Sequence, residues 1–190
     1  MNVNENGAGT GSHLPVLRWA HTEVQRHGWG GSVLEFGAGK YSTSFLYDLE
    51  RHGFPTASIE PPGEWRGYLE ERFPGHDFRA RYDGDWWDVV LIDNGSNPET
   101  WLDERVRALK QVRGKCAIAL VHDWHIGPGH KDGLVTSFEH HGWFAPDERL
   151  MHTAIVSDRV EVAGASIPGG RVYTGWDDAP GKWDDDVWPN

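Results

Sequence analysis

The sequence predicts a single α/β domain with one doubly wound, mostly parallel sheet and helices on both faces. Two patterns predict this fold. Short, continuous apolar runs alternate along the chain with segments whose apolar residues recur at helical spacing, as buried parallel strands do with their crossover helices. Most of these runs also end in glycine or polar residues. Right-handed crossovers would bring those ends to one edge of a Rossmann-like sheet, where such folds bind ligands.

Length and composition fit one globular domain. A chain of 190 residues can bury a substantial core, and 38% hydrophobic with 25% charged residues is the balance of a folded protein rather than a disordered one. We expect a flexible lead at residues 1–12, the folded domain at residues 13–176, and an acidic, tryptophan-containing tail at residues 177–190.

Charge and cysteine content limit the partners and the compartment. A net charge of −11 repels phosphate backbones, which argues against broad nucleic-acid binding and leaves a small molecule as the expected partner. No apolar run approaches the roughly 20 residues that a membrane helix needs, and the N-terminus lacks a signal-peptide pattern. The single cysteine, Cys116, permits no intrachain disulfide, so we expect a cytoplasmic protein. The oligomeric state is left open.

The first expected elements are a helix, a strand and a second helix. Residues 14–27 carry apolar side chains at helical spacing and end at glycines. Residues 32–36 form a short apolar run that meets a glycine turn, which indicates a buried strand. Residues 41–52 have an apolar stripe, with Ser42 or Thr43 as the expected N-cap.

The middle of the chain continues this alternation. Residues 56–60 predict a second strand, which two prolines stop, and residues 65–73 predict a helix with its large apolar side chains on one face. Residues 77–82 alternate apolar and polar side chains, as a third strand would. Residues 87–92 are the clearest buried strand in the sequence.

The last elements are two helices and three strands. A proline near the first turn is typical of the helix expected at residues 98–112, and the apolar run at residues 116–121 predicts a strand after it. A glycine-rich loop then leads to a short helix expected at residues 134–141. Strands at residues 152–158 and 171–176 complete the expected fold.

The glycine loop after the first strand is the first candidate binding site. Gly37 and Gly39 permit a tight turn and a close approach of a ligand to the backbone, and the following helix N-terminus would favour a carboxylate. Ser42 stands where a dinucleotide fingerprint needs a third glycine or alanine, and the P-loop pattern is absent from the loop. Glu35 suits a ligand with a cationic group and would repel a pyrophosphate. A purely structural glycine turn is the alternative.

A second carboxylate ends the second strand. Glu60 follows the glycines by about 20 residues, the spacing at which an acid can accept hydrogen bonds from both hydroxyls of a ribose. The alternative is an exposed loop acid before Pro61.

These features resemble the class I S-adenosylmethionine-dependent methyltransferases. The first motif of that family is an acid followed by Gly-x-Gly directly after the first strand, and residues 35–39 (Glu-Phe-Gly-Ala-Gly) match it. Ser42 and Thr43 resemble the variant found in small O-methyltransferase-like members. The resemblance spans about residues 33–123, or roughly half of the chain.

The resemblance implies S-adenosylmethionine as the cofactor. The residues that it assigns to cofactor binding are Glu35, Gly37, Gly39, Ser42, Glu60, Asp83 and Asp93. The glycine loop entered at Glu35 would hold the amino-acid end of the cofactor, and Glu60 would hold the ribose. Asp83, with Asp85 as its competitor, matches the position that meets the adenine amino group. Trp65 or Trp86 could stack on the ring.

Acids and histidines follow the fourth and fifth strands. Metal-dependent O-methyltransferases of this family place acids or asparagine there, so the resemblance implies a divalent cation such as Mg²⁺ on Asp93, Asp123 and His122, with Asn94 as a further candidate. Without a metal, His122 or His125 could act as general base, because an unperturbed imidazole titrates at about pH 6.5. The catalytic candidates are His122, Asp123 and His125. The alternative is that the acids cap helices and the histidines are ordinary loop residues.

The sequence therefore predicts an S-adenosylmethionine-dependent methyltransferase that methylates a small molecule, at oxygen, by direct displacement. The chain lacks the Pro-Pro-aromatic and Pro-Cys motifs of DNA base methyltransferases after its fourth strand. Two other functions stay open. One is a metal-dependent hydrolase or hydroxylase-like enzyme that uses Asp93, His122, Asp123 and His125, and the other is a non-catalytic module that only binds the cofactor.

Overall fold

The computed structural model describes residues 13–95, 100–124, 132–146 and 153–175. Within them the chain forms one eight-stranded sheet in the order β3-β2-β1-β4-β5-β7-β6-β8. The expected lead at residues 1–12 and the expected tail at residues 177–190 lie outside the described residues.

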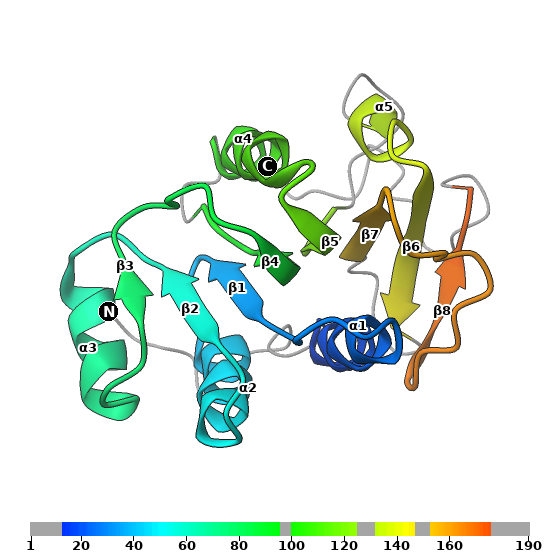
Figure 1. Ribbon diagram of the computed structural model, residues 1–190. Helices are drawn as coiled ribbons and strands as arrows, with labels where there is room; N and C mark the ends of the chain where they lie inside the picture. The colour runs from blue at the N-terminus through cyan, green and yellow to red at the C-terminus, as the bar shows by residue number, and fades with distance from the viewer. Residues whose placement is uncertain (1–12, 96–99, 125–131, 147–152, 176–190) are drawn as a thin grey trace.

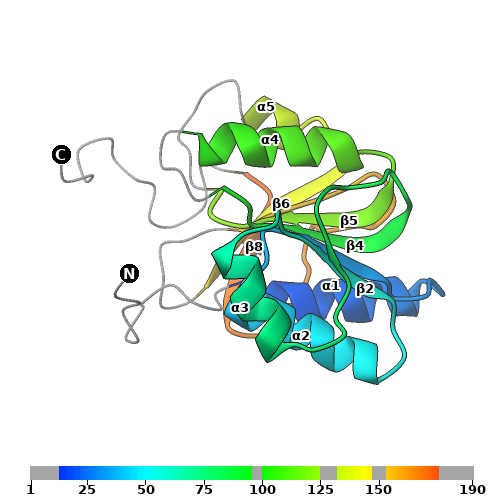
Figure 2. The same cartoon turned by 90° about the vertical axis from the view of Figure 1, so that its left-hand side faces the viewer.

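Helices cover both faces of this sheet, as the sequence predicts. Figure 2 shows α1, α2 and α3 on one face and α4 and α5 on the other. The helices are α1 (Leu14–Arg26), α2 (Lys40–Arg51), α3 (Glu64–Arg72), α4 (Trp101–Val112) and α5 (Asp132–Val135). The strands are β1 (Val33–Phe36), β2 (Thr56–Ile59), β3 (Phe78–Arg79), β4 (Trp87–Ile92), β5 (Cys116–Val121), β6 (His140–Pro146), β7 (Thr153–Ser157) and β8 (Gly170–Tyr173).

One half of the sheet is parallel and fully covered. Strands β3, β2, β1, β4 and β5 are neighbours in parallel pairing. Along β4 the side chains alternate between the two faces: Val89 and Leu91 pack in the apolar layer under α1, and Val90 and Ile92 pack in the layer under α4. Because both faces are buried, the strand reads as an unbroken apolar run.

The other half corrects the prediction of a mostly parallel sheet. The pairings β5–β7, β6–β7 and β6–β8 are all antiparallel, so the sheet is mixed (Figure 1). Six residues join Pro146 at the end of β6 to Thr153 at the start of β7. A parallel pair needs a crossover of about a dozen residues or more, so a connection this short forces the two strands to run in opposite directions.

The helix expected at residues 134–141 is also wrong in its second half. Helix α5 stops at Val135, and β6 begins at His140. Strand β6 lies between β7 and β8, with Trp143 and Phe144 buried. This segment forms a strand because it pairs with a strand on each side, and strand formation depends more on such neighbours than on the segment's own residues.

The strand order reverses between β1 and β4, the two central strands of the parallel half. Chain connections leave this point in opposite directions, which is the switch point of a doubly wound sheet. Ligands of doubly wound sheets bind at such a switch point. Among the described residues, none of the helices has the length and apolar character needed to cross a membrane.

Candidate functional site

The glycine loop of residues 37–39 joins β1 to α2 and packs against the end of β4. Gly37 has φ +83°, and a Cβ there would lie 2.6 Å from the carbonyl oxygen of Asp93 and from the Cα of Asn94. The N–H of Asp93 in turn donates to the carbonyl of Phe36 at 2.8 Å. Gly37 is therefore required for backbone conformation and for close packing, which joins the loop to the strand end that carries Asp93.

The N-terminus of α2 opens on this loop without a side-chain cap. The N-cap is Gly39 in an extended conformation, and the first turn contains no acid. The prediction of Ser42 or Thr43 as the cap is wrong, since both lie inside the first turn and are buried. The exposed N–H groups and the positive end of the helix dipole are suited to a carboxylate ligand.

Glu35 lies beneath the loop and is fully buried. Its Oε1 accepts hydrogen bonds from Ser58 Oγ at 2.6 Å and from Thr43 Oγ1. Burial raises the pKa of Glu35 to about 7, although the hydroxyls of Ser58, Thr43 and Ser42 lower it. Glu35 thus ties β1 to β2 and α2 beneath the loop.

Glu60 reaches the glycine loop from the end of β2. Strand register pairs Phe36 with Ile59, so the loop and Glu60 follow at the same edge of the sheet. Glu60 Oε2 accepts a hydrogen bond from the N–H of Ala38 at 3.0 Å. Burial raises the pKa of this half-buried carboxyl, while the Ala38 hydrogen bond and the charge of Arg66 oppose that rise. The two carboxylates assigned to the cofactor therefore lie at one edge, as expected.

An aromatic surface borders the loop on the side of α3. Trp65 Nε1 donates to the carbonyl of Ala38 at 2.8 Å, and the indole stacks on Tyr68 with ring centroids 5.4 Å apart. Both rings are partly exposed, at 40%. Of the two tryptophans expected to stack on an adenine, Trp65 is beside the loop.

Two other expected adenine contacts lie elsewhere. Trp86 precedes β4 and donates to Asp88, whose carboxylate also accepts from Ser32 before β1, so this indole belongs to the amino edge of the sheet. Asp83 pairs with Arg79 on the surface, and none of its contacts involves the glycine loop.

The residues after β4 and β5 come together as the sequence predicts. His122 Nδ1 lies 3.0 Å from Asp93 Oδ1, and His122 Nε2 lies 3.3 Å from Asp123 Oδ1. Burial alone would raise the pKa of Asp93, but His122 and Arg105 outweigh it and hold that pKa below its usual value. The imidazole thus lies between two carboxylates. His125 lies outside the described residues.

Arg105 is the main residue of this cluster that the sequence does not reveal. It comes from α4 and is buried, with Nη2 at 2.7 Å from Asp93 Oδ1 and Nη1 at 3.6 Å from Asp123 Oδ2. Nε also donates to the carbonyl of Asn94, and Nη1 donates to that of His122. The guanidinium thus bridges the two acids that were expected to hold a metal. Its place on the apolar stripe of a helix is the signal that could have found it.

A second unforeseen residue, His13, packs against the cluster at the start of α1. Its ring centroid lies 4.5 Å from that of His122, and neither ring nitrogen has a hydrogen-bond partner. Burial and the neighbouring His122 lower the pKa of His13 to about 4. His13, Asp93 and His122 are a group whose ligand atoms lie within 4.8 Å of one another. Asp123, expected in the metal set, is not part of this group.

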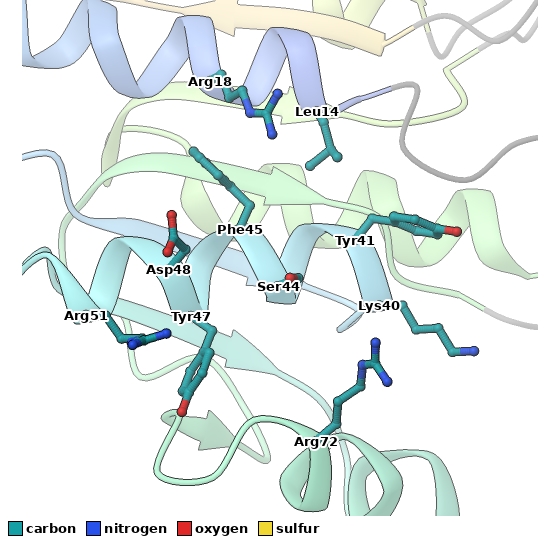
Figure 3. A pocket seen from close by; sticks show the side chains of 10 residues that line it. All are labelled: Leu14, Arg18, Lys40, Tyr41, Ser44, Phe45, Tyr47, Asp48, Arg51 and Arg72. Carbon is teal, nitrogen blue, oxygen red and sulfur yellow. The ribbon is translucent and has the colours of Figure 1, made fainter.

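A separate hollow of about 640 Å³ lies on the outer face of α2 and is drawn in Figure 3. It begins at Lys40, directly after the glycine loop, and extends to Arg51 at the end of the helix. Its lining residues come from α1, α2 and α3 and are Leu14, Arg18, Lys40, Tyr41, Ser44, Phe45, Tyr47, Asp48, Arg51 and Arg72. Four of them are basic and one is acidic.

Comparison with solved structures finds proteins with a similar fold. A crystal structure of WbdD matches with a TM-score of 0.56 and 17% identity, over 88% of this chain and 44% of that chain. A structure of the bifunctional kinase-methyltransferase WbdD matches with a TM-score of 0.55 and 16% identity, over 80% of this chain and 41% of that chain. The chain thus spans less than half of the length of these proteins.

A looser match is a TehB-like SAM-dependent methyltransferase from Corynebacterium glutamicum, with a TM-score of 0.49 and 11% identity, over 73% of this chain and 86% of that chain. No family model and no curated protein matches the sequence. The likeness to WbdD confirms the Rossmann-like fold that the resemblance to class I methyltransferases predicts.

Proposed function

We propose that the chain is an S-adenosylmethionine-dependent methyltransferase that methylates a small molecule at oxygen. The observation that carries this proposal is the hydrogen bond from Ala38 N–H to Glu60, which brings an acid onto the glycine loop beside an uncapped helix N-terminus. A dinucleotide fingerprint needs a third glycine or alanine in this loop, and Ser42 stands at that position.

The residues present fit this cofactor at three points. The N–H groups of the first turn of α2, which no side chain caps, would take its carboxylate, and the acid Glu35 lies beneath the loop, where it favours a cationic amino group nearby. Glu60, already at the loop, would accept from the ribose hydroxyls. Trp65 would supply a flat surface for the adenine. When bound, the cofactor supplies an electrophilic methyl group on sulfur.

The chain's own part in the reaction is to orient the acceptor and remove its proton. We assign proton removal to His122, because Asp93 can hold its Nδ1–H while Nε2 takes the proton. The resulting imidazolium would lie between the carboxylates of Asp93 and Asp123, which stabilise its charge. Arg105 fixes both strand ends and so positions the base. No covalent enzyme intermediate is needed, since correct alignment of nucleophile, methyl and sulfur suffices.

A divalent cation on Asp93, Asp123 and His122 fits the site poorly. Arg105 already bridges the two acids, and oxygen-rich sites for Mg²⁺ leave no room for a guanidinium at that position. The same arginine weighs against the metal-dependent hydrolase that the sequence left open. We therefore route no step through a metal.

Binding of S-adenosylhomocysteine tests the proposal. Isothermal titration should show one site in the unaltered protein, and Glu60→Ala should weaken affinity at least tenfold, about 1.4 kcal/mol, because the ribose hydroxyls lose their acceptor. The matched control is Glu71→Ala, an exposed acid on α3, which should bind like the unaltered protein. Failure of the unaltered protein to bind, or equal affinity in both variants, would reject the proposal.

A further inference from the structure

The hollow on the outer face of α2 gathers positive charge in an acidic protein. The chain has 29 acidic and 18 basic side chains, yet the hollow is lined by four basic residues and only Asp48 as an acid. Arg18 comes from α1, Lys40 and Arg51 from α2, and Arg72 from α3. Their convergence from three helices raises the local positive potential, which a random surface of this composition would not do.

None of these four cations forms an ion pair with another described residue. Within the part of the chain that the structure describes, the ion pairs of arginine are made by Arg26, Arg66, Arg79, Arg105 and Arg113. Three of the four contact aromatic rings instead: Arg18 lies 5.7 Å from the ring centroid of Phe45, Lys40 lies 5.5 Å from that of Tyr68, and Arg72 lies 5.9 Å from that of Phe73. No acid among the described residues therefore neutralises these charges.

The positions of the charges indicate more than one anionic group. Lys40 and Arg51 are the first and last residues of α2, so they are separated by roughly 16 Å along the helix axis at about 1.5 Å per residue. Figure 3 shows Arg18 and Arg72 on opposite sides of the same helix. Figure 3 also shows the Lys40 and Arg51 side chains at opposite ends of the hollow, so one small anion at either end would meet only part of this charge. A molecule with two separated oxyanions can meet more of it, and about 640 Å³ is a normal volume for a small-molecule site.

The hollow also has an apolar surface between the charges. Phe45 and Tyr47 line it together with Tyr41, which is 46% exposed. Such rings can pack against the carbon skeleton of a small molecule while arginine guanidinium groups bind its phosphate or carboxylate oxygens.

We propose that this hollow binds a small organic molecule that carries at least two separated oxyanion groups, phosphate or carboxylate. The hollow starts beside the cofactor loop at Lys40 and runs along the outer face of α2 to Arg51, and its proposed ligand does not depend on methyl transfer. Arginine presents a planar pair of donors that matches either oxyanion, so the shared chemistry is a multivalent oxyanion rather than one named compound.

Titration with chosen probes tests this site. Fructose 1,6-bisphosphate carries two separated phosphates, citrate carries clustered carboxylates, and inorganic phosphate carries one charged group. We expect the bisphosphate to bind at least tenfold more tightly than inorganic phosphate, with an affinity that falls as salt increases. Comparable binding of citrate would identify carboxylates as accepted groups, and weaker binding would identify phosphate; both agree with a multivalent oxyanion site.

A double variant, Arg51→Gln with Arg72→Gln, should lower the bisphosphate affinity at least tenfold. The matched control is Arg81→Gln with Arg107→Gln, which changes net charge equally at two exposed arginines outside the hollow. Circular dichroism checks that both variants fold, and both should keep the S-adenosylhomocysteine affinity of the unaltered protein. No saturable bisphosphate binding, or equal losses in the two double variants, would overturn the proposal whatever the result at the cofactor site.

Discussion

The two halves of the sheet differ in what their strand ends can build. In the parallel half (β3, β2, β1, β4 and β5) every strand points the same way, so the residues after the strands meet at one edge. In the antiparallel half (β7, β6 and β8) neighbouring strands end at opposite edges. Glu60, Asp93, His122 and Asp123 follow strands of the first kind and meet at that edge. Strand direction thus decides where polar side chains can converge.

Buried polar groups follow the same division. Glu35, Arg105 and His122 are buried in the parallel half, whereas the buried polar side chains on the described strands β6, β7 and β8 are the hydroxyls of Thr153 and Ser157. Buried ionisable groups cost stability unless they are paired, and the group formed by Arg105, Asp93 and His122 at the ends of β4 and β5 is therefore typical of a site.

The largest expected difference between the halves comes from glycine. Gly37→Ala combines a strained positive φ with a Cβ at 2.6 Å from backbone atoms, so we expect a loss of about 4 kcal/mol or more in the free energy of unfolding. Gly164→Ala in the antiparallel half has a similar φ, +74°, but no atom near the added Cβ, and should cost about 1 to 2 kcal/mol. Urea unfolding measures both. Equal losses would show that the loop does not pack on β4 as described.

A smaller effect concerns pH and the buried Glu35. Its native pKa of about 7 lies above the value of 4.5 for an exposed carboxyl, so the native state holds this proton more tightly and loses stability as pH rises from 4.5 to 7. Glu35→Gln removes that loss. We expect the stability of the variant relative to the unaltered protein to rise by about 2 to 3 kcal/mol between pH 5 and pH 8.

The comparison between variants isolates Glu35 from its neighbours. The lowered pKa of His13 acts in the opposite direction, adding stability that is present above pH 6.5 and is lost as pH falls toward 4, but His13 is present in both proteins. Urea unfolding at the two pH values gives the result. A relative stability that does not change with pH would mean that Glu35 is not a buried, protonatable carboxyl.

Much of the parallel half could be predicted from sequence, for a physical reason. A strand buried on both faces must be apolar throughout, so β4 and β5 were found with the bounds that the structure gives. Asp93 and His122 directly follow these two strands in the sequence, so predicting the strand ends also predicted where these residues lie. Glu35 was located too, within a strand predicted to be buried, but its hydrogen bonds to Ser58 and Thr43 were not foreseen, because those residues belong to other elements.

The rest depended on contacts between distant segments. Strand β6 forms because it pairs with β7 and β8, and the local sequence pattern does not predict that pairing. Arg105 reaches the site from the middle of α4, and His13 reaches it from the start of α1. Neither residue stands next to a strand end in the sequence, so reasoning from strand ends could not include them.

Hydrogen–deuterium exchange with and without S-adenosylhomocysteine tests the central claim most directly, because it locates the ligand on one half of the sheet. The account predicts slower exchange in residues 36–44, where the loop and the uncapped first turn of α2 lie, and in residues 59–63 around Glu60, with no change in β6, β7 and β8. Protection confined to the antiparallel half, or no protection of residues 36–44 at a saturating ligand concentration, would contradict it.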